Sequence, residues 1–487
     1  MGKKETKEEK DFLSFIQESG LIWGPSPEIY GGLAGFYTYG PLGKLLKNKI
    51  ENSVRKIFTL YEFKEIEEPT VLPDIVWKAS GHLETFNDKT IKCKKCNSTF
   101  RADKLIEESQ DVSADSYSDK KILELIKEKN IKCPSCKGNF ENKIEKQSLM
   151  MKTKVAGQDA SLRPETATST YLPFQRLYNY ARKKLPFGVF QIGKAYRNEI
   201  SPRQHVLRMR EFTQAEAQLF LSPEQKNSWH YFSEIKKETL PLWPYQEQEK
   251  NPSHNLQKQL NPQKQLKEIT IEKAMQNKII KTQAYAWCLF IAYLQFINFG
   301  IPREKIRLRQ HHPDERAFYA EDAWDIEIKL NNYSWIEMCG IHDRTDYDLK
   351  QHSKFSNIKL EAQKENSSEK FTPHILEIAF GIDRPLYALI DLFYNKKSAE
   401  QGKTSFELPY HMAPIDISVF PLMKKPELIK LAKDVQEILE QDFVVEYDDS
   451  GSIGRRYLRS STQGTPFAVT IDFDSIKNND VTIRHRD

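Results

Sequence analysis

Four of the six cysteines in this chain have the spacing of metal ligands. Cys93 and Cys96 form one C-x-x-C pair, Cys133 and Cys136 form another, and 36 residues lie between the pairs. Four thiolates suit tetrahedral zinc, and because protein would fill every position, we expect the metal to be structural. The alternative, four unrelated buried thiols, is disfavoured by two such pairs in a polar, Lys-rich segment.

A second group combines arginines with carboxylates. The strand-like segment 190–199 ends in Arg197-Asn198-Glu199, and after a loop the chain returns through 206–212, which contains Arg208. Far downstream, Gly381 ends a strand and Arg384 begins a helix. The sequence contains no G-x-x-x-x-G-K-[ST] loop and no G-x-G-x-x-G after a strand. Any nucleotide chemistry must therefore depend on arginines and carboxylates.

These segments resemble a known enzyme family. The strand–loop–strand with Arg-x-Glu and the late Gly-x-x-Arg are similar to motifs 2 and 3 of class II aminoacyl-tRNA synthetases. The helix from Leu45 and the strand ending at Pro69 resemble motif 1, the dimer element of that family. Further blocks resemble the dimeric, archaeal–eukaryotic type of glycyl-tRNA synthetase, in order from about residue 13 to residue 487. They are Gly31–Tyr37, Ser80–His82, Arg101–Glu107, Leu162–Ala167, Arg197–Arg203, Trp335–Glu337, Asp343–Arg344, Ser450–Tyr457 and Gly464–Phe467.

The resemblance implies an ATP site. Arg197 would hold the α-phosphate and stabilise the transition state, as a fixed cation should during attack at phosphorus. Glu199 would accept a hydrogen bond from the adenine amino group, and Phe212 would stack on the ring. Arg208 and Arg384 would bind the outer phosphates. The other implied ATP-site residues are Asn198, Met209, Met338 and Glu337, of which Glu337 would help to bind the magnesium that accompanies ATP.

The resemblance also implies a glycine site. Glu165, Glu216 and Glu377 would surround the ammonium group, and Arg344 would pair with the carboxylate. Arg101 and Ala379 complete the implied set. Three carboxylates suit a substrate that has no side chain and must be recognised by its ammonium group. A pocket filled by that substrate leaves no room for an additional methyl group.

Three departures from the family pattern stand out. Ala379 occupies a position where the family usually has serine, so we expect glycine binding to be weaker by about 0.5–1.5 kcal/mol, the net value of one hydrogen bond. Thr168-Ser169 replaces the usual Gln-Gly. Ser461-Thr462 stands where an acidic pair usually precedes Gly464, in the part expected to discriminate between tRNAs.

The expected fold is a multi-domain α+β protein. The resemblance implies a class II antiparallel sheet flanked by helices, a zinc-binding insertion and a C-terminal α/β anticodon-binding domain. The expected boundaries are 1–11 (disordered start), 12–87 (catalytic domain with motif 1), 88–160 (zinc-binding insertion), 161–221 (motif 2), 222–318 (second, helical insertion), 319–405 (motif 3) and 406–487 (anticodon-binding domain).

Composition narrows the class of protein. The 487 residues are 39% hydrophobic and 29% charged, with a net charge of +5, so overall basicity is weak evidence for a nucleic-acid partner. No apolar run reaches the roughly 18 residues of a membrane helix, and the start lacks a signal peptide's apolar region. We therefore expect a cytoplasmic protein without a membrane partner. Cys288 and Cys339 are expected to be ordinary core or surface thiols.

Three hypotheses follow. The first is an active glycyl-tRNA synthetase, a homodimer with one zinc per chain that binds ATP, glycine and tRNA(Gly). The second is a non-catalytic, nucleic-acid-binding paralogue, which the presence of Arg197, Glu199 and Arg384 disfavours. The third is a related enzyme with shifted amino-acid choice, motivated by Ala379 and Thr168 but disfavoured by the three pocket glutamates.

Overall fold

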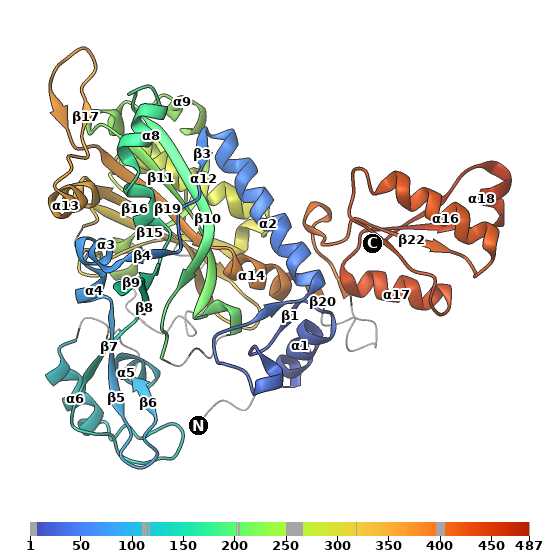
Figure 1. Cartoon of the computed structure of the whole chain (residues 1–487), viewed down its shortest axis with the longest axis horizontal. Coiled ribbons are helices and arrows are strands. Elements are labelled where there is room, and N and C mark those ends of the chain that lie inside the picture. The colour runs from blue at the N-terminus through green and yellow to red at the C-terminus, as the bar shows by residue number, and fades with distance from the viewer. Residues whose placement is uncertain are drawn as a thin grey trace.

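The computed structural model describes residues 7–109, 114, 117–200, 202, 205–249, 266–317, 319–395 and 405–486. Figure 1 shows a large domain built around one sheet, a small insertion containing β5, β6, α5 and α6, and a C-terminal domain beside helix α2. Among the described helices, none combines the length and the apolar character that crossing a membrane requires.

The large domain is organised by a nine-stranded sheet with the order β13-β12-β14-β15-β16-β19-β11-β10-β3. Its pairs are antiparallel except β10 with β3 and β12 with β14. The strands are β3 (Phe63–Glu65), β10 (Phe187–Tyr196), β11 (Glu211–Leu221), β12 (Thr239–Trp243), β13 (Lys267–Thr270), β14 (Ile306–Gln310), β15 (Asp322–Lys329), β16 (Trp335–Thr345) and β19 (His374–Gly381). This agrees with the expected class II antiparallel sheet.

Helices pack against one face of this sheet and form the main core. They are α2 (Pro41–Leu60), α12 (Gln283–Asn298) and α14 (Asp383–Phe393). Because side chains alternate along a strand, Leu219 and Leu376 point into this core. Their neighbours Phe220 and Ile375 point to the other face, into a smaller cluster with α7 (Ala167–Tyr171) and α8 (Phe174–Tyr180). That second face carries the cavity described below.

The helices predicted by periodicity are present. The apolar positions from Leu45 fall within α2, and the helix expected at 382–394 is α14. The expected disordered start at 1–11 is wrong in its second half, because α1 (Lys7–Glu18) begins at Lys7. Phe12 and Phe15 hold this helix in place by ring contacts with Tyr394 and Phe406. Residues 1–6 lie outside the described part of the chain.

The expectation of a helical insertion at 222–318 is also incorrect. The described part of this segment supplies strands β12, β13 and β14 to the central sheet, and its helix α12 is buried in the core. Strand β12 is hard to recognise because it is short and contains Pro241, a residue that strands tolerate mainly near a sheet edge. Residues 250–265 of the expected helical insertion lie outside the described residues.

The cysteine-containing segment has a small core of its own. Strands β5 (Asn87–Lys92), β6 (Thr99–Arg101) and β7 (Glu145–Ser148) form a three-stranded sheet. Helices α5 (Ala102–Ser109) and α6 (Asp119–Glu128) accompany it. Ile91, Phe100, Ile106 and Ile122 are buried together here, apart from the main core. The chain then returns through β8 (Met151–Val155) and β9 (Gln158–Leu162), which pair with each other, and β9 also pairs with β4 (Val71–Pro73).

The C-terminal domain has the expected α/β pattern. Strand β22 (Ile417–Pro421) runs parallel to both β23 (Val445–Tyr447) and β24 (Phe467–Ile471), and β25 (Thr482–His485) is antiparallel at the edge. Helices α16 (Pro426–Leu439), α17 (Ile453–Gln463) and α18 (Phe473–Asn478) complete it.

Candidate active site

A polar cavity of about 250 Å³ lies over strands β11, β19 and β16. Along β11 the side chains of Phe212, Gln214 and Glu216 share the cavity face because they are two residues apart. The predicted site residues that line the cavity are Glu165, Arg197, Glu199, Arg208, Met209, Phe212, Glu216, Glu337, Met338, Arg344, Glu377, Ala379 and Arg384. Segments far apart in the sequence are thus brought into one site.

Three carboxylates form one end of the cavity, and each is held by hydrogen bonds. Glu216 accepts from the hydroxyl of Thr166 at 2.5 Å, and Glu377 accepts from the hydroxyl of Tyr171 at 3.0 Å. Glu165 accepts from the hydroxyl of Thr168 at 2.6 Å and lies 3.4 Å from Nε2 of His82. Thr168, a departure from the family pattern, therefore contributes directly to this end of the site.

The three carboxyls do not share one ionisation state. Burial, together with the charges of Glu165 and Glu377, raises the pKa of Glu216 to about 8. Burial alone would raise the pKa of Glu165, but His82 and Arg344 outweigh it and lower that pKa. Burial is similarly outweighed at Glu377, whose pKa is lowered mainly by Arg344. At neutral pH this end of the cavity therefore holds two carboxylates, Glu165 and Glu377, and the protonated carboxyl group of Glu216.

Arg344 is already engaged in buried ion pairs. Its Nε and Nη2 donate to the two carboxylate oxygens of Asp348 at 2.8 and 2.9 Å, and its Nη1 donates to Oε1 of Glu377 at 3.2 Å. The guanidinium also lies 4.2 Å from the ring centroid of Tyr319. To pair with a substrate carboxylate, as the resemblance implies, Arg344 would have to exchange its contact with Glu377.

Arginines form the other end. Arg197 lies between two rings, with its guanidinium 5.4 Å from the centroid of Phe86 and 5.3 Å from that of Phe212, and its Nε donates to the carbonyl of Pro164. This packing fixes the guanidinium in the cavity wall. Arg384 donates from Nη1 to the carbonyl of Glu337 at 2.8 Å and lies 3.3 Å from that residue's carboxylate.

Glu199 and Arg208 bind each other in this structure. Nε and Nη2 of Arg208 both lie 2.7 Å from Oε2 of Glu199. The Glu199 side chain is buried, whereas that of Arg208 is 28% exposed, so the pair is only partly shielded from solvent. The predicted adenine ligand and one predicted phosphate ligand are therefore linked to each other in this structure.

Two predicted residues do not line the cavity. Arg101 belongs to the insertion, where it hydrogen-bonds to Asp103 and lies 3.4 Å from Oδ1 of Asp88. The backbone N–H of Asn198 donates to the carbonyl of Leu149 at 2.8 Å. Their roles in substrate binding stay predictions.

Comparison with known proteins identifies the family. Residues 150–393 match the model of the tRNA synthetase class II core domain (G, H, P, S and T), and residues 416–487 match the anticodon binding domain. Glycine–tRNA ligase of Thermococcus kodakarensis is 37% identical over an alignment 566 positions long, gaps included, which covers 100% of this chain and 96% of that protein. The chain belongs to the glycine–tRNA ligase family.

Other comparisons agree with this membership. Glycine–tRNA ligase of Methanocaldococcus jannaschii is also 37% identical, with 98% of this chain and 96% of that protein covered. Among solved structures, Giardia lamblia prolyl-tRNA synthetase in complex with prolyl-adenylate has a TM-score of 0.59 at 14% identity, covering 98% of this chain and 71% of that one. At that identity the likeness concerns the fold, and it matches the class II architecture that the glycine–tRNA ligase family shares.

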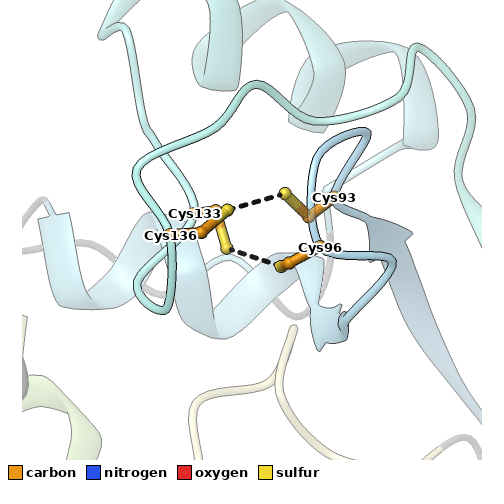
Figure 2. A group of neighbouring side chains, drawn as sticks. All are labelled: Cys93, Cys96, Cys133 and Cys136. Carbon is orange, nitrogen blue, oxygen red and sulfur yellow. Dashed lines mark hydrogen bonds between the residues drawn. The ribbon is translucent and has the colours of Figure 1, made fainter.

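This member of the glycine–tRNA ligase family also has a compact cysteine cluster. Figure 2 shows the two C-x-x-C turns facing each other with their sulfurs in the middle. All four sulfurs lie within 4.8 Å of one another, with Sγ of Cys93 3.5 Å from that of Cys136 and Sγ of Cys96 3.6 Å from that of Cys133. Tetrahedral zinc with Zn–S bonds of about 2.3 Å needs sulfurs roughly 3.8 Å apart, so this donor set fits zinc.

Some of the residues that line or support this cavity were not identified from the sequence. His342 and Tyr319 line it, and His82 and Tyr171 hold its carboxylates. The alternation of β16 could have found His342, because Gly340, His342 and Arg344 are each two residues apart and share a face. His82 lies in the Ser80–His82 block of the resemblance, but that short turn does not by itself indicate its contact.

Proposed function

We propose that this chain activates glycine with ATP, forming glycyl-adenylate and pyrophosphate, and then transfers glycine to the 3′ end of tRNA(Gly). The observation that carries this proposal is the two-ended cavity, with the carboxyl groups of Glu165, Glu216 and Glu377 at one end and the guanidinium groups of Arg197, Arg208 and Arg384 near the other. Glycine is a zwitterion without a side chain. Its ammonium can therefore face the anionic end of the cavity while its carboxylate faces the cationic end. The chain's membership of the glycine–tRNA ligase family supports the same substrate.

The first step needs no nucleophile from the protein. The ammonium of glycine would lie among Glu165, Glu216 and Glu377, so that its carboxylate points toward Arg197. A carboxylate oxygen then attacks the α-phosphorus, a new O–P bond forms, and the bond to the bridging oxygen of pyrophosphate breaks. Arg197 would stabilise the charge on the α-phosphoryl oxygens as they become equatorial. Because its packing is fixed, little reorganisation is needed during the reaction.

Nucleotide binding would separate Glu199 from Arg208. We propose that the adenine amino group takes over the acceptor Glu199, while Arg208 turns with Arg384 toward the outer phosphates. The carboxylate of Glu337 lines the cavity beside Arg384 and would hold magnesium with the ATP phosphates, where that ion neutralises pyrophosphate. In the transfer step, a ribose hydroxyl of the tRNA 3′ end attacks the activated carbonyl and AMP leaves.

We also propose that the cysteine cluster holds one structural zinc ion. The four sulfurs occupy every tetrahedral position, so the ion would stabilise the insertion and would not contact substrate. Because the ion would take no part in the reaction, metal content tests this proposal directly. The proposed compartment is the cytoplasm, where such thiols stay reduced.

The proposed assembly is a homodimer formed through the β3 edge of the sheet. β3 is the terminal strand, next to Leu60, whose side chain is 68% exposed, and to a groove of about 840 Å³ lined by Tyr61, Tyr180 and Tyr231. An open strand edge beside apolar surface favours pairing with another chain. Leu60→Asp should shift the mass measured by light scattering from dimer to monomer, whereas Ile75→Asp, an exposed site elsewhere, should not.

ATP–pyrophosphate exchange tests the enzymatic proposal. Purified protein would be assayed with glycine, alanine, serine or no amino acid, beside an Arg197→Ala variant. Exchange with glycine alone, lost in the variant, is the expected result. Comparable exchange with alanine or serine would instead favour shifted specificity. No exchange in a folded, zinc-loaded protein would overturn the enzyme proposal and favour a nucleic-acid-binding paralogue.

A further inference from the structure

Three neighbouring strands form a small grid on the cavity face. Strand register places Glu216 opposite Ala379, and Ala379 opposite Gly340. The adjacent row contains Gln218, Glu377 and His342 in the same strand order. Because these positions are two apart along each strand, both rows present their side chains to the same face.

The row that contains Glu216 has the two smallest side chains of the grid. Ala379 and Gly340 themselves fill little of the cavity beside the carboxyl of Glu216, where a substrate side chain would enter. A Cβ atom built on Gly340 would lie 2.7 Å from Cε1 of His342, closer than real Cβ contacts come. The imidazole of His342 therefore lies across Gly340 and occupies the space that the glycine leaves.

The same imidazole is fixed by a hydrogen bond. Its Nδ1 lies 3.1 Å from Oε1 of Glu377, which also interacts with Tyr171 and Arg344. The ring of His311 lies 6.3 Å away, centroid to centroid, and is bound to Asp325, so the hydrogen bond to Glu377 is the contact that positions the imidazole of His342. His342 is thus held in one place while its exposed edge lines the cavity.

We propose that His342 determines amino-acid specificity at this site. Its ring orients Glu377 toward the substrate ammonium and fills the volume over Gly340 that the side chain of alanine or serine would need. The inference rests on the proposed activation of glycine. Ala379 carries only a methyl group and Gly340 has no side chain, so within this row the ring of His342 over Gly340 supplies the restriction.

The test compares exchange kinetics of the wild type with His342→Ala, His342→Gln and His311→Ala. In His342→Ala we expect the KM for glycine to rise roughly tenfold, because Glu377 loses a hydrogen bond. The ratio of kcat/KM for alanine to that for glycine should rise about 10- to 100-fold as the volume opens. The KM for ATP should stay within about twofold, a separation that a general folding defect would not produce. His342→Gln, which keeps a donor, should retain the glycine KM within about threefold, and His311→Ala should resemble the wild type.

A second variant keeps the proposal testable if His342→Ala does not fold. Gly340→Ala must displace the imidazole, so the glycine KM should rise without a gain in alanine exchange, because the new methyl fills the vacated space. Unchanged glycine KM and unchanged discrimination in either variant would overturn the role of His342. Absence of glycine-dependent exchange in the wild type would instead overturn the proposed function, so the two failures are distinguishable.

Discussion

The ammonium of Lys47 lies 2.7 Å from Oδ1 of Asp383 in an ion pair that is almost completely buried. Lys47 comes from helix α2 and Asp383 from the first turn of α14, next to Arg384 in the sequence. The other carboxylate oxygen of Asp383 accepts from the backbone N–H of Thr213 in β11 at 2.6 Å. One carboxylate therefore connects the elements that resemble motifs 1, 2 and 3, and it fixes where Arg384 enters the cavity.

Removal of this pair should cost both stability and nucleotide binding. Lys47→Met leaves Asp383 buried without its counter-charge, which typically destabilises a protein by about 3–5 kcal/mol. We expect a lower thermal midpoint and a higher KM for ATP in exchange assays, because Arg384 follows Asp383. Lys49→Met is the matched control, since Lys49 on the same helix pairs with Asp416 at a more exposed site and should lose only about 1 kcal/mol or less. Equal effects of the two substitutions would contradict the prediction.

The pKa of Glu216 predicts a pH dependence of glycine binding. In the free protein this pKa is raised to about 8, so Glu216 is protonated below that pH and must lose its proton when an ammonium binds beside it. The kcat/KM for glycine should therefore rise with pH, by up to about tenfold per unit below pH 8, and level off above it. Glu216→Gln should lower kcat/KM and remove this part of the profile. A profile that keeps its slope in the variant would assign the titration to another group.

The cysteine cluster predicts a defined metal content. We expect one zinc per chain by elemental analysis, and Cys133→Ser should lose it, because only three thiolates remain. Without the metal, protease cleavage should increase within the insertion, whose own hydrophobic core is small. Cys288→Ala, which removes a buried thiol outside the cluster, should keep the zinc. Retention of a full zinc equivalent by Cys133→Ser would contradict the assignment.

The alanine at position 379 predicts a gain of function. Ala379→Ser would add a hydroxyl to the grid position between Glu216 and Gly340, where it can hydrogen-bond with the substrate or with a carboxylate. One such bond is worth about 0.5–1.5 kcal/mol, so the KM for glycine should fall roughly 2- to 10-fold. Steady-state exchange kinetics measure this directly. An unchanged or higher KM would show that the position no longer contributes to glycine binding.

Features carried by local sequence were predictable. Arg197, Glu199 and Phe212 lie on one strand–loop–strand, so their common location follows from a single hairpin. The helix from Leu45 is strongly periodic, and the cysteine pairs define their cluster by spacing alone. In these cases a local pattern, either a periodicity, a hairpin or a C-x-x-C spacing, indicates the structure.

Features that depend on distant partners were not predictable. The sequence could not show that Arg344 forms an ion pair with Glu377, because the two residues face each other only when β16 and β19 are paired. Strand β12 has weak strand propensity and is formed through its pairing with β13 and β14. The contact between His342 and the space over Gly340 depends on the orientation of one ring. Each requires the tertiary structure, which overrides local preference.

Helix α1 has a practical consequence for shortening the protein. Phe12 and Phe15 pack on Tyr394 and Phe406, which lie at the end of α14 and at the start of the segment leading to the C-terminal domain. Helix α1 therefore stabilises the end of the large domain, at the segment that leads to the C-terminal domain. A chain trimmed to begin at Leu21 would lack Phe12 and Phe15, expose the rings of Tyr394 and Phe406 and loosen this junction, whereas an affinity tag placed before Lys7 would leave these contacts intact.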